Sequence, residues 1–405
     1  MKLKKSYFSI FALAFVILVT SGHPFSTVPG NLFYYLLVPS SLMLYYRLSK
    51  KKNLWQKNIL TYTFLLFVFL VVSSFIINFN INNFGTNIKF LLVISFSYLF
   101  CLSIPFYLFS KYYIRTLKVI SIISLLGYYI LNFTSLNLPL ATFKNINDVE
   151  YYNGIFFFAI KSFAGGYDNI GIDRNIGTFW EPGLFATFIL IAIILELWNK
   201  NKTSKLTILI FLITLYTTKS TYGYLMLVPI SFELLTKVLN KRFSFSLTIF
   251  LITIVVFLNY KLNDFISWLV QINPRLFSKL IDESNSFNAR IESPLTNLRI
   301  FENNYLFGAG LGNTENLFSN MTIGAQTSTS TYFLAAFGFL GIAYTLLFIY
   351  GILSYKEVNL SSRLVFLIII LTQINKEPHI YFTTTFIFMF YFLINTRNRR
   401  SYVYK

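Results

Sequence analysis

Long apolar runs constrain the fold of this sequence more than any other feature. About twelve of them can be drawn, near residues 6–21, 32–46, 58–80, 88–109, 114–133, 181–198, 206–218, 222–236, 243–260, 331–354, 364–375 and 379–395. A helix needs roughly 20 apolar residues to cross about 30 Å of hydrocarbon, and most of these runs approach that length. Only 12% of the 405 residues are charged, about half the proportion in soluble domains. The sequence therefore predicts an all-α polytopic membrane protein with about 12 transmembrane helices, forming a single integral membrane domain over residues 1–405.

Composition also excludes several other classes of protein. The single cysteine, Cys101, lies inside an apolar run, so neither a disulfide framework nor a cysteine metal site is expected. The chain carries 34 Lys and Arg against 15 Asp and Glu, a formal net charge of +19. When the first span enters from the cytoplasm, every short inner loop is basic, as the positive-inside rule requires. We therefore predict a multi-pass plasma-membrane protein of a bacterium with both termini in the cytoplasm, and the charge does not indicate nucleic acid as a partner.

The start of the chain resembles a signal peptide, because Lys2, Lys4 and Lys5 precede an apolar run. No cleavage site of small residues follows it, so we expect this run to stay as the first helix. Two segments on the predicted outer side are much longer than the inner loops, at 134–180 and 261–330. Because loops on a rigid scaffold commonly carry function, these two extracytoplasmic loops are the expected location of a site.

Each outer loop contains an apolar stretch that is unsuited to spanning the membrane. In the first loop, residues 154–164 (GIFFFAIKSFA) are expected to form an interfacial or re-entrant helix. In the second loop, residues 262–280 are expected to form a helix in the outer interface, interrupted at Pro274. This second helix either covers the top of the bundle or contacts a lipid-linked substrate.

The segment from Gly171 to Ala186 places three charged residues where the chain re-enters the membrane, namely Asp173, Arg174 and Glu181. Pro182 suits the first turn of the following helix, so Glu181 is expected at its N-cap, where the helix dipole stabilises a carboxylate. An arginine at this depth is costly unless it is paired or faces a cavity. Arg174 therefore either forms an ion pair that fixes the loop or binds an anionic ligand.

The second outer loop contains a predicted helix with two arginines, followed by a turn and three alternating glycines. The glycines follow no predicted strand, so a dinucleotide site is excluded, and they allow close approach of either a bulky ligand or a neighbouring helix. The planar guanidinium groups of these arginines can donate paired hydrogen bonds to phosphate oxygens. Alternatively, they pair with nearby Glu and Asp residues. The candidate substrate-binding residues of both loops are Asp173, Arg174, Arg290, Arg299, Gly308, Gly310 and Gly312.

Taken in order, these segments resemble the O-antigen polymerase and ligase superfamily, and within it a Wzy-like polysaccharide polymerase. The resemblance covers roughly residues 165–345 and lies in four pieces. They are Arg174-x-x-Gly177-x-Phe179-x-Glu181-Pro182-Gly183-x-Phe185-Ala186, then Lys219-Ser220-Thr221, then Arg290 with Leu306–Gly312, and finally Thr331–Leu334 before Gly338–Gly341.

The resemblance implies a GT-C-like glycosyltransferase that uses no metal, cofactor or nucleotide sugar. Its members join glycan units carried on undecaprenyl pyrophosphate at the outer face of the plasma membrane, for capsule, O-antigen or exopolysaccharide. By this analogy Arg174 and Arg290 hold the donor pyrophosphate. The implied partners are the lipid-linked oligosaccharide and membrane lipid, with a chain-length regulator and a flippase as candidate protein partners.

One departure from the family concerns the base that deprotonates the acceptor hydroxyl. Related ligases carry a histidine just before the span that begins near Gly338, where this chain has residues 326–331 (QTSTST). The candidate catalytic residues are therefore Glu181, Glu302, Glu377 and His379, any of which requires hydrogen-bond reach of the acceptor. His379 can equally be a structural residue of its turn.

Two other functions remain open from the sequence. An O-antigen ligase-type transferase would share the scaffold and use a different acceptor. A flippase or transporter of lipid-linked oligosaccharides would place ionisable residues within the spans to line a path. Here those residues gather in the two outer loops, which favours the polymerase.

Overall fold

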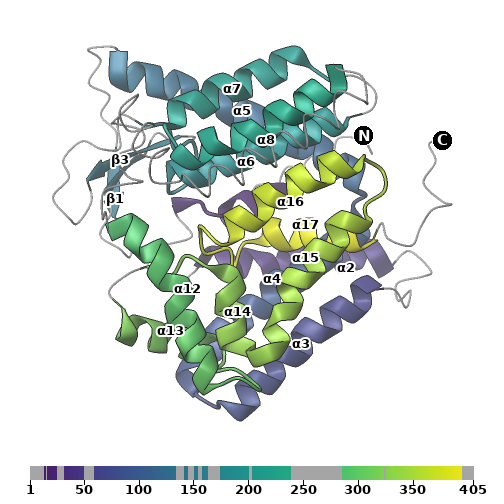
Figure 1. Ribbon diagram of the computed structural model, residues 1–405, viewed down its shortest axis with the longest axis vertical. Helices are drawn as coiled ribbons and strands as arrows, with labels where there is room; N and C mark the ends of the chain where they lie inside the picture. Colours follow the sequence, from purple (N-terminus) through teal and green to yellow (C-terminus); the bar gives the residue numbers. More distant parts are fainter. Residues whose placement is uncertain are drawn as a thin grey trace, which may run out of the picture.

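The computed structural model describes residues 13–14, 16–24, 32–49, 59–133, 141–144, 150–153, 157–162, 174–199, 203–238, 285–322 and 325–394. These residues are mostly helical (Figure 1). The first half contains η2 (Leu32–Leu36), α2 (Leu37–Ser49), α3 (Ile59–Ile77), η3 (Ile81–Asn83), α4 (Phe84–Ser103), α5 (Phe106–Phe133), α6 (Pro182–Trp198), α7 (Lys205–Thr218) and α8 (Thr221–Val238). The second half contains α12 (Asn285–Asn303), α13 (Leu311–Met321), α14 (Thr329–Phe337), η5 (Gly338–Ile342), α15 (Ala343–Ser354), α16 (Leu360–Ile374) and α17 (Thr383–Ile394).

Within this part of the chain, four helical stretches are long and apolar enough to cross a membrane. They are Ile59–Ile77, Ile81–Ser103, Phe106–Phe133 and Thr329–Ser354. Four shorter apolar helices accompany them, namely α6, α7, α16 and α17. This composition is consistent with an all-α membrane protein. The predicted span near 243–260, the predicted interfacial helix at 262–280 and half of the first predicted span, 6–21, lie outside the described residues.

Two of the four shorter apolar helices, α6 and α17, are buried on every side. Each residue of α6 from Pro182 to Leu197 is buried, and so is each residue of α17 from Thr383 to Leu393. A helix that is hydrophobic all round belongs in the interior. Helix α6 packs against α5, α7, α8 and α16, whereas α17 packs against α3, α4 and α15.

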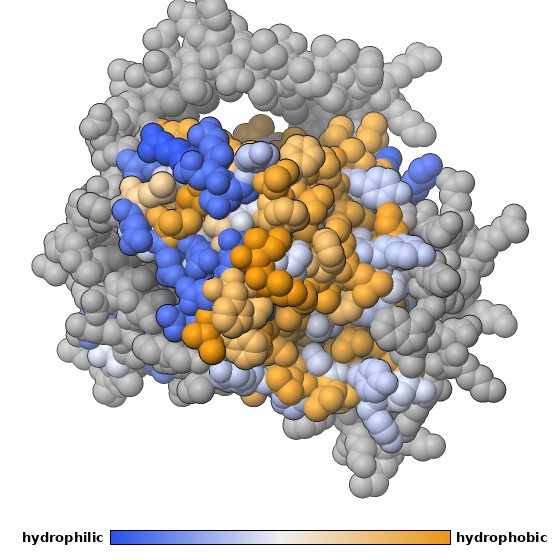
Figure 2. Space-filling model, turned by 90° about the horizontal axis from the view of Figure 1, so that it is seen from below, coloured by the Kyte–Doolittle hydropathy of each residue, from blue (hydrophilic) through white to orange (hydrophobic). Residues whose placement is uncertain are grey.

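Apolar side chains also cover much of the outside. On α3, the exposed side chains include Leu65, Phe69, Val72 and Ile76. In the view from below, hydrophobic residues cover the middle of the molecule and hydrophilic residues gather at the left (Figure 2). Helices α12 and α13 lie at that same end in Figure 1. An apolar band beside a polar end is the surface expected of a protein that sits in a bilayer.

The first of the two predicted outer loops contains a small sheet, so the predicted interfacial helix at 154–164 is wrong. Strands β1 (Ala141–Lys144), β2 (Glu150–Asn153) and β3 (Phe158–Ser162) form an antiparallel sheet in the order β1-β2-β3. In its register Ala141 pairs with Asn153, and Asn153 pairs with Phe158. An isolated helix of 11 residues would be marginal, whereas cross-strand pairing of aromatic residues stabilises strands.

The boundary between α4 and α5 also differs from the expected one. The apolar runs place it near 109–114, but α4 ends at Ser103 and α5 begins at Phe106. Pro105 lies between them, and a proline disfavours helix at the residue before it and offers no N–H. Lys111, which falls between the two predicted runs, therefore lies on α5, as do Arg115 and Lys118, and all three are within its first four turns.

Candidate functional site

Residues 174–181, which lead into α6, are held in place by hydrogen bonds to surrounding elements. The Asn175 side chain donates to Ser124 Oγ at 3.2 Å and to Thr217 Oγ1 at 3.0 Å. Its Oδ1 accepts the backbone N–H of Gly177 at 3.0 Å, in a turn where Gly177 has a φ of 58°. The Gly177 carbonyl in turn accepts the N–H of Phe158 from β3 at 2.8 Å. The sheet thus supports the segment that carries Arg174 and Glu181.

The predicted start of α6 is confirmed. Glu181 is the N-cap with extended backbone angles, and Pro182 occupies the first turn. Proline fits there because the first N–H groups of a helix have no partner within the helix. The carboxylate of Glu181 consequently lies at the positive end of the dipole of α6.

Glu181 forms a hydrogen-bonded pair with Glu377, from the turn between α16 and α17. Two cations approach the pair closely. Lys376 Nζ lies 3.4 Å from Glu377 Oε1, and a guanidinium nitrogen of Arg290 lies 4.0 Å from the same oxygen. The Glu377 side chain is 8% exposed and that of Lys376 is 13% exposed, whereas that of Arg290 is 40% exposed. Arg290 therefore lies on the open side of the site.

The two carboxyl groups differ in their protonation. Burial raises the pKa of Glu377 well above its usual range, and the neighbouring charge of Glu181 raises it further. Burial also acts to raise the pKa of Glu181, but the hydrogen bond from Glu377 and the charges of Lys376, Arg290 and Arg174 lower it overall. Two carboxyl groups this close share one proton. Glu377 holds it and Glu181 is ionised. Among the described residues, Lys376 and Arg290 therefore lie beside a pair that carries one negative charge, which leaves an excess of positive charge.

Lys376 is placed by a glycine and by an aromatic ring. A Cβ atom at Gly183, in the first turn of α6, would overlap Lys376 Nζ. The ammonium group also lies 4.8 Å from the centre of the Tyr222 ring on α8, at cation–π distance. Lys376 thereby bridges α6, α8 and the turn that follows α16.

Arg174 lies at the edge of this group, where it joins the end of α7 to the site. Its Nε donates to the carbonyl of Thr218 at 3.3 Å, and a terminal nitrogen donates to that of Lys219 at 2.9 Å. Lys219 ends α7 in the left-handed conformation with a φ of 47°. A cation at the last carbonyls of a helix is favourable. The charge of Arg174 also acts on Glu181, as does that of Arg290, so one arginine from each predicted outer loop acts on the same carboxylate.

Residues 326–331 connect α12 to the turn that carries Lys376 and Glu377. On the α12 side, Ser293 Oγ accepts the N–H of Thr327 at 2.9 Å, and Asn297 donates to Thr331 Oγ1 at 3.0 Å. On the other side, Thr329 Oγ1 accepts the N–H of His379 at 2.8 Å. These bonds fix α12, and with it Arg290, beside Glu377.

His379 is buried, and protein groups contact both of its ring nitrogens. The Gln373 amide nitrogen lies 3.1 Å from Nε2, and Thr385 Oγ1 lies 2.7 Å from Nδ1. Because Gln373 Oε1 accepts from Thr187, its amide nitrogen donates to Nε2 and the histidine hydrogen is on Nδ1. Burial, with the charge of Lys376, lowers the pKa of His379 to about 3. The arrangement suits a structural residue, and its predicted catalytic role stays a prediction.

Other predicted site residues are not brought to the carboxyl pair. Arg299 and Glu302 are on α12 with Arg290, but they are exposed and lie about 14 and 18 Å further along the helix axis. Asp173 lies outside the described residues.

The three glycines of the second loop are used for packing. A Cβ atom at Gly308 would overlap the backbone of Ala336, and one at Gly312 would overlap the Asn83 side chain. The N–H of Gly310 donates to the Ala336 carbonyl at 2.9 Å. The sequence left two alternatives for these glycines, close approach of a bulky ligand or of a neighbouring helix. The structure shows the second, since all three lie against neighbouring helices.

Two charged groups were missed from the sequence. Lys376 could have been found, because a lysine at the end of an apolar run is costly unless it is paired. The second is Lys89 on α4, whose ammonium group lies 4.3 Å and 4.2 Å from the ring centres of Tyr34 and Tyr381. Tyr381 in turn donates to Glu315 at 2.6 Å. No local pattern marks that cluster, since its members come from four separate segments.

No protein-family model and no curated protein matches this chain. The arrangement of the residues is therefore the basis on which a function can be assigned.

Proposed function

We propose that this protein is a polysaccharide repeat-unit polymerase. It transfers an undecaprenyl-pyrophosphate-linked glycan onto another lipid-linked unit at the outer face of the plasma membrane. One observation supports the proposal, namely that Arg290 and Lys376 lie beside the Glu181–Glu377 pair, while the charge of Arg174 also acts on Glu181. A buried site with excess positive charge suits a diphosphate, and its ionised carboxylate can accept a proton.

In the proposed reaction an acceptor hydroxyl attacks the anomeric carbon of the donor. The new carbon–oxygen bond forms while the bond from that carbon to the phosphate oxygen breaks, and the pyrophosphate leaves with the electron pair. Negative charge therefore grows on the leaving group, where fixed cations in a poorly hydrated site stabilise it. Arg290 and Lys376 take this role, and Arg174 adds its charge at the edge.

The hydroxyl proton goes to Glu181, the ionised member of the pair. Glu377 supports this step because it holds the shared proton and keeps Glu181 oriented by their hydrogen bond. A base must lie within hydrogen-bond reach of the acceptor. Of the four candidates, Glu181 and Glu377 form the pair beside Arg290 and Lys376, and Glu181 is its ionised member. This favours Glu181 as the base over Glu302 and over His379, whose two ring nitrogens contact protein groups.

The proposal includes a membrane arrangement. Glu181 precedes α6 and Glu377 follows α16, so both are at the ends of short apolar helices, where the lipid headgroups would lie. We place this end outside, in a GT-C-like chain of about 12 spans with cytoplasmic termini, because the loops at the other ends are basic.

The decisive experiment supplies purified protein with a defined lipid-pyrophosphate-linked repeat unit and measures the length of the product. We expect polymer, formed equally well in the presence of a metal chelator. Arg290→Ala should leave single repeat units, whereas Arg299→Ala, on the same helix and away from the pair, should make wild-type polymer. Equal activity of the two variants would refute the site, and translocation of the unit without joining would favour the flippase.

A further inference from the structure

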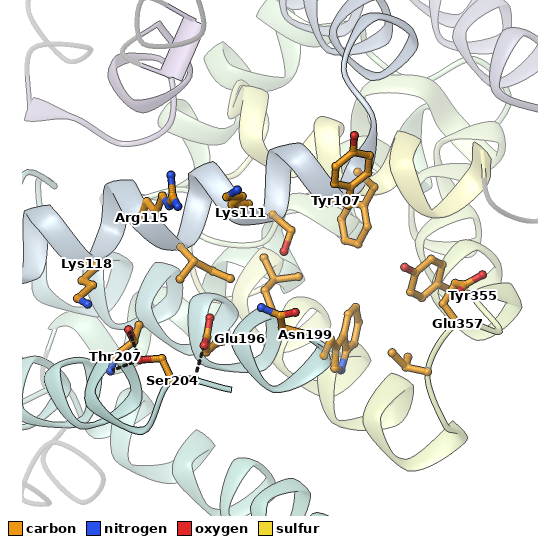
Figure 3. A pocket seen from close by; sticks show the side chains of 16 residues that line it. Tyr107, Lys111, Arg115, Lys118, Glu196, Asn199, Ser204, Thr207, Tyr355 and Glu357 are labelled. Atoms are coloured by element: carbon orange, nitrogen blue, oxygen red, sulfur yellow. Dashed lines mark hydrogen bonds between the residues drawn. The ribbon is translucent and has the colours of Figure 1, made fainter. Parts of the chain in front are cut away.

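A second polar region lies at the other end of α6. A cavity of about 660 Å³ is lined by α5, α6, α7 and the connection between α15 and α16 (Figure 3). Small-molecule sites typically measure about 300–1,000 Å³. Glu181 precedes α6 and Asn199 follows it, so the cavity and the carboxyl pair are separated by about 27 Å along that helix. This distance is close to the thickness of a bilayer's hydrocarbon core.

One wall of the cavity is basic. Lys111, Arg115 and Lys118 all line it, and their spacing of four and then three residues places them on one face of α5. Figure 3 shows Lys118 extending from α5 toward Ser204 and Thr207. Helix α5 has 28 residues, about 42 Å, which is longer than the hydrocarbon core. Its first two turns, with Lys111, can therefore extend into the headgroup region. The long side chains of Arg115 and Lys118, which lie deeper on α5, can reach toward that region.

The carboxylates that line the cavity do not neutralise the positive charge of Lys111, Arg115 and Lys118. Glu196 accepts the backbone N–H of Ser204 at 2.6 Å, which compensates part of its charge. Glu357 lies beside Tyr355, at the opposite end of the cavity from Lys118 (Figure 3). The cavity is therefore polarised, with its positive charge along α5.

The rest of the lining is apolar and aromatic. Trp198 and Tyr355 stack with their ring centres 5.8 Å apart, and Ile114 and Leu195 also line the cavity. Rings of this kind favour the boundary between lipid and water. A soluble anion would contact only the basic side chains of the cavity. A lipid would contact these side chains with its phosphate and the apolar side chains with its glycerol and acyl chains.

We propose that this cavity binds the phosphate headgroup of an anionic phospholipid from the leaflet opposite the carboxyl pair. Lys118 and Arg115 contact the phosphate, while the apolar lining contacts the glycerol and the start of the acyl chains. Basic pockets between membrane helices on the cytoplasmic side bind such headgroups. The positive-inside arrangement places this leaflet on the cytoplasmic side. The inference does not depend on the proposed transferase activity.

The test measures lipid binding to the purified full chain in detergent by native mass spectrometry, with phosphatidylglycerol, phosphatidylcholine and inorganic phosphate as probes. We expect wild-type protein to prefer phosphatidylglycerol over phosphatidylcholine by about tenfold or more, a difference in affinity that two charge-assisted contacts can supply. The preference should weaken at high salt. Equal binding of the two lipids would overturn the proposal, and so would inorganic phosphate competing as well as the lipid.

A pair of variants locates the site. Arg115→Gln combined with Lys118→Gln should abolish the preference, whereas Lys356→Gln, an exposed cation outside the lining, should keep it. A preference that survives the double substitution would show that the lipid binds elsewhere. Should the double variant fail to fold, the comparison of probes on wild-type protein still decides the outcome.

Discussion

Gly183, in the first turn of α6, lies so close to the ammonium group of Lys376 that a methyl group at position 183 would overlap Nζ. The cation is thus brought to the start of α6 because the residue there has no side chain. The overlapping atom is the end of a flexible side chain, so a substitution can displace the charge while leaving the backbone in place.

Gly183→Ala should therefore reduce polymer formation by about tenfold or more, because about 1.4 kcal/mol of lost transition-state stabilisation has that effect. The folded yield should stay close to that of wild type. Gly85→Ala is the matched control, since a Cβ atom at Gly85, in α4, meets open space. Initial rates and thermal unfolding of the purified variants provide the readouts. Wild-type rates for Gly183→Ala would show that the position of Lys376 does not matter.

Removing the charge of Lys376 should change how activity depends on pH. Lys376 is among the groups that lower the pKa of Glu181, and a general base works only while it is ionised. Lys376→Met should raise the pKa of Glu181, so activity should be lost at a higher pH as the solution is acidified. A kcat/KM profile measures this shift, with Lys356→Met as a control. If Lys376→Met and wild type lose activity at the same acidic pH, Glu181 is not the base.

Arg174→Lys should shorten the polymer. The guanidinium donates to two carbonyls at the end of α7 from one rigid plane, and an ammonium group cannot reproduce that geometry. The loss of a hydrogen bond also costs about 1 kcal/mol of stability. Chain-length distributions on gels test the prediction, and Arg299→Lys should leave them unchanged. A wild-type distribution for Arg174→Lys would contradict it.

Burial of neutral His379 should make stability depend on pH. Its pKa is about 3 in the folded protein and 6.5 when unperturbed, so between these values the unfolded chain binds more protons. The free energy of unfolding therefore falls as the pH drops below 6.5, by up to about 1.4 kcal/mol per pH unit. His379→Gln should remove this slope, as thermal unfolding between pH 4 and pH 8 would reveal. Identical slopes for the two proteins would mean that the histidine is not held neutral.

Gly308 and Gly310 should differ in their tolerance of a side chain. Gly308 and Gly310 have φ values of 70° and 83°, so alanine strains the backbone at both positions. Only at Gly308 would the new Cβ atom also overlap the backbone, that of Ala336, since at Gly310 the nearest atoms are 3.6 Å away. We expect Gly308→Ala to lower folded yield and melting temperature more than Gly310→Ala. The reverse order would contradict the packing role.

Features that depend on a few neighbouring residues were predictable from the sequence. The apolar runs predicted α3, α6, α7, α8 and α16 to within a few residues at most ends, because a backbone in hydrocarbon must satisfy its own hydrogen bonds. Pro182 and Glu181 predicted the start of α6, since proline and an acidic residue suit the first turn. Arg174 was a candidate because an arginine at a membrane edge needs a partner, and Arg290 because a guanidinium group matches phosphate oxygens. Glu181 and Glu377 were candidates as bases.

The pairing of these residues could not be read along the chain. Glu181 and Glu377 meet only because α6 and α16 pack side by side, and Lys376 joins them through the gap left at Gly183. The sheet in the first outer loop likewise depends on pairing between strands. Such contacts join segments far apart in sequence, so their energy depends on packing that no local pattern encodes. Apolar periodicity and capping residues specify where the helices lie, and the packing of those helices selects which of many edge charges share a proton.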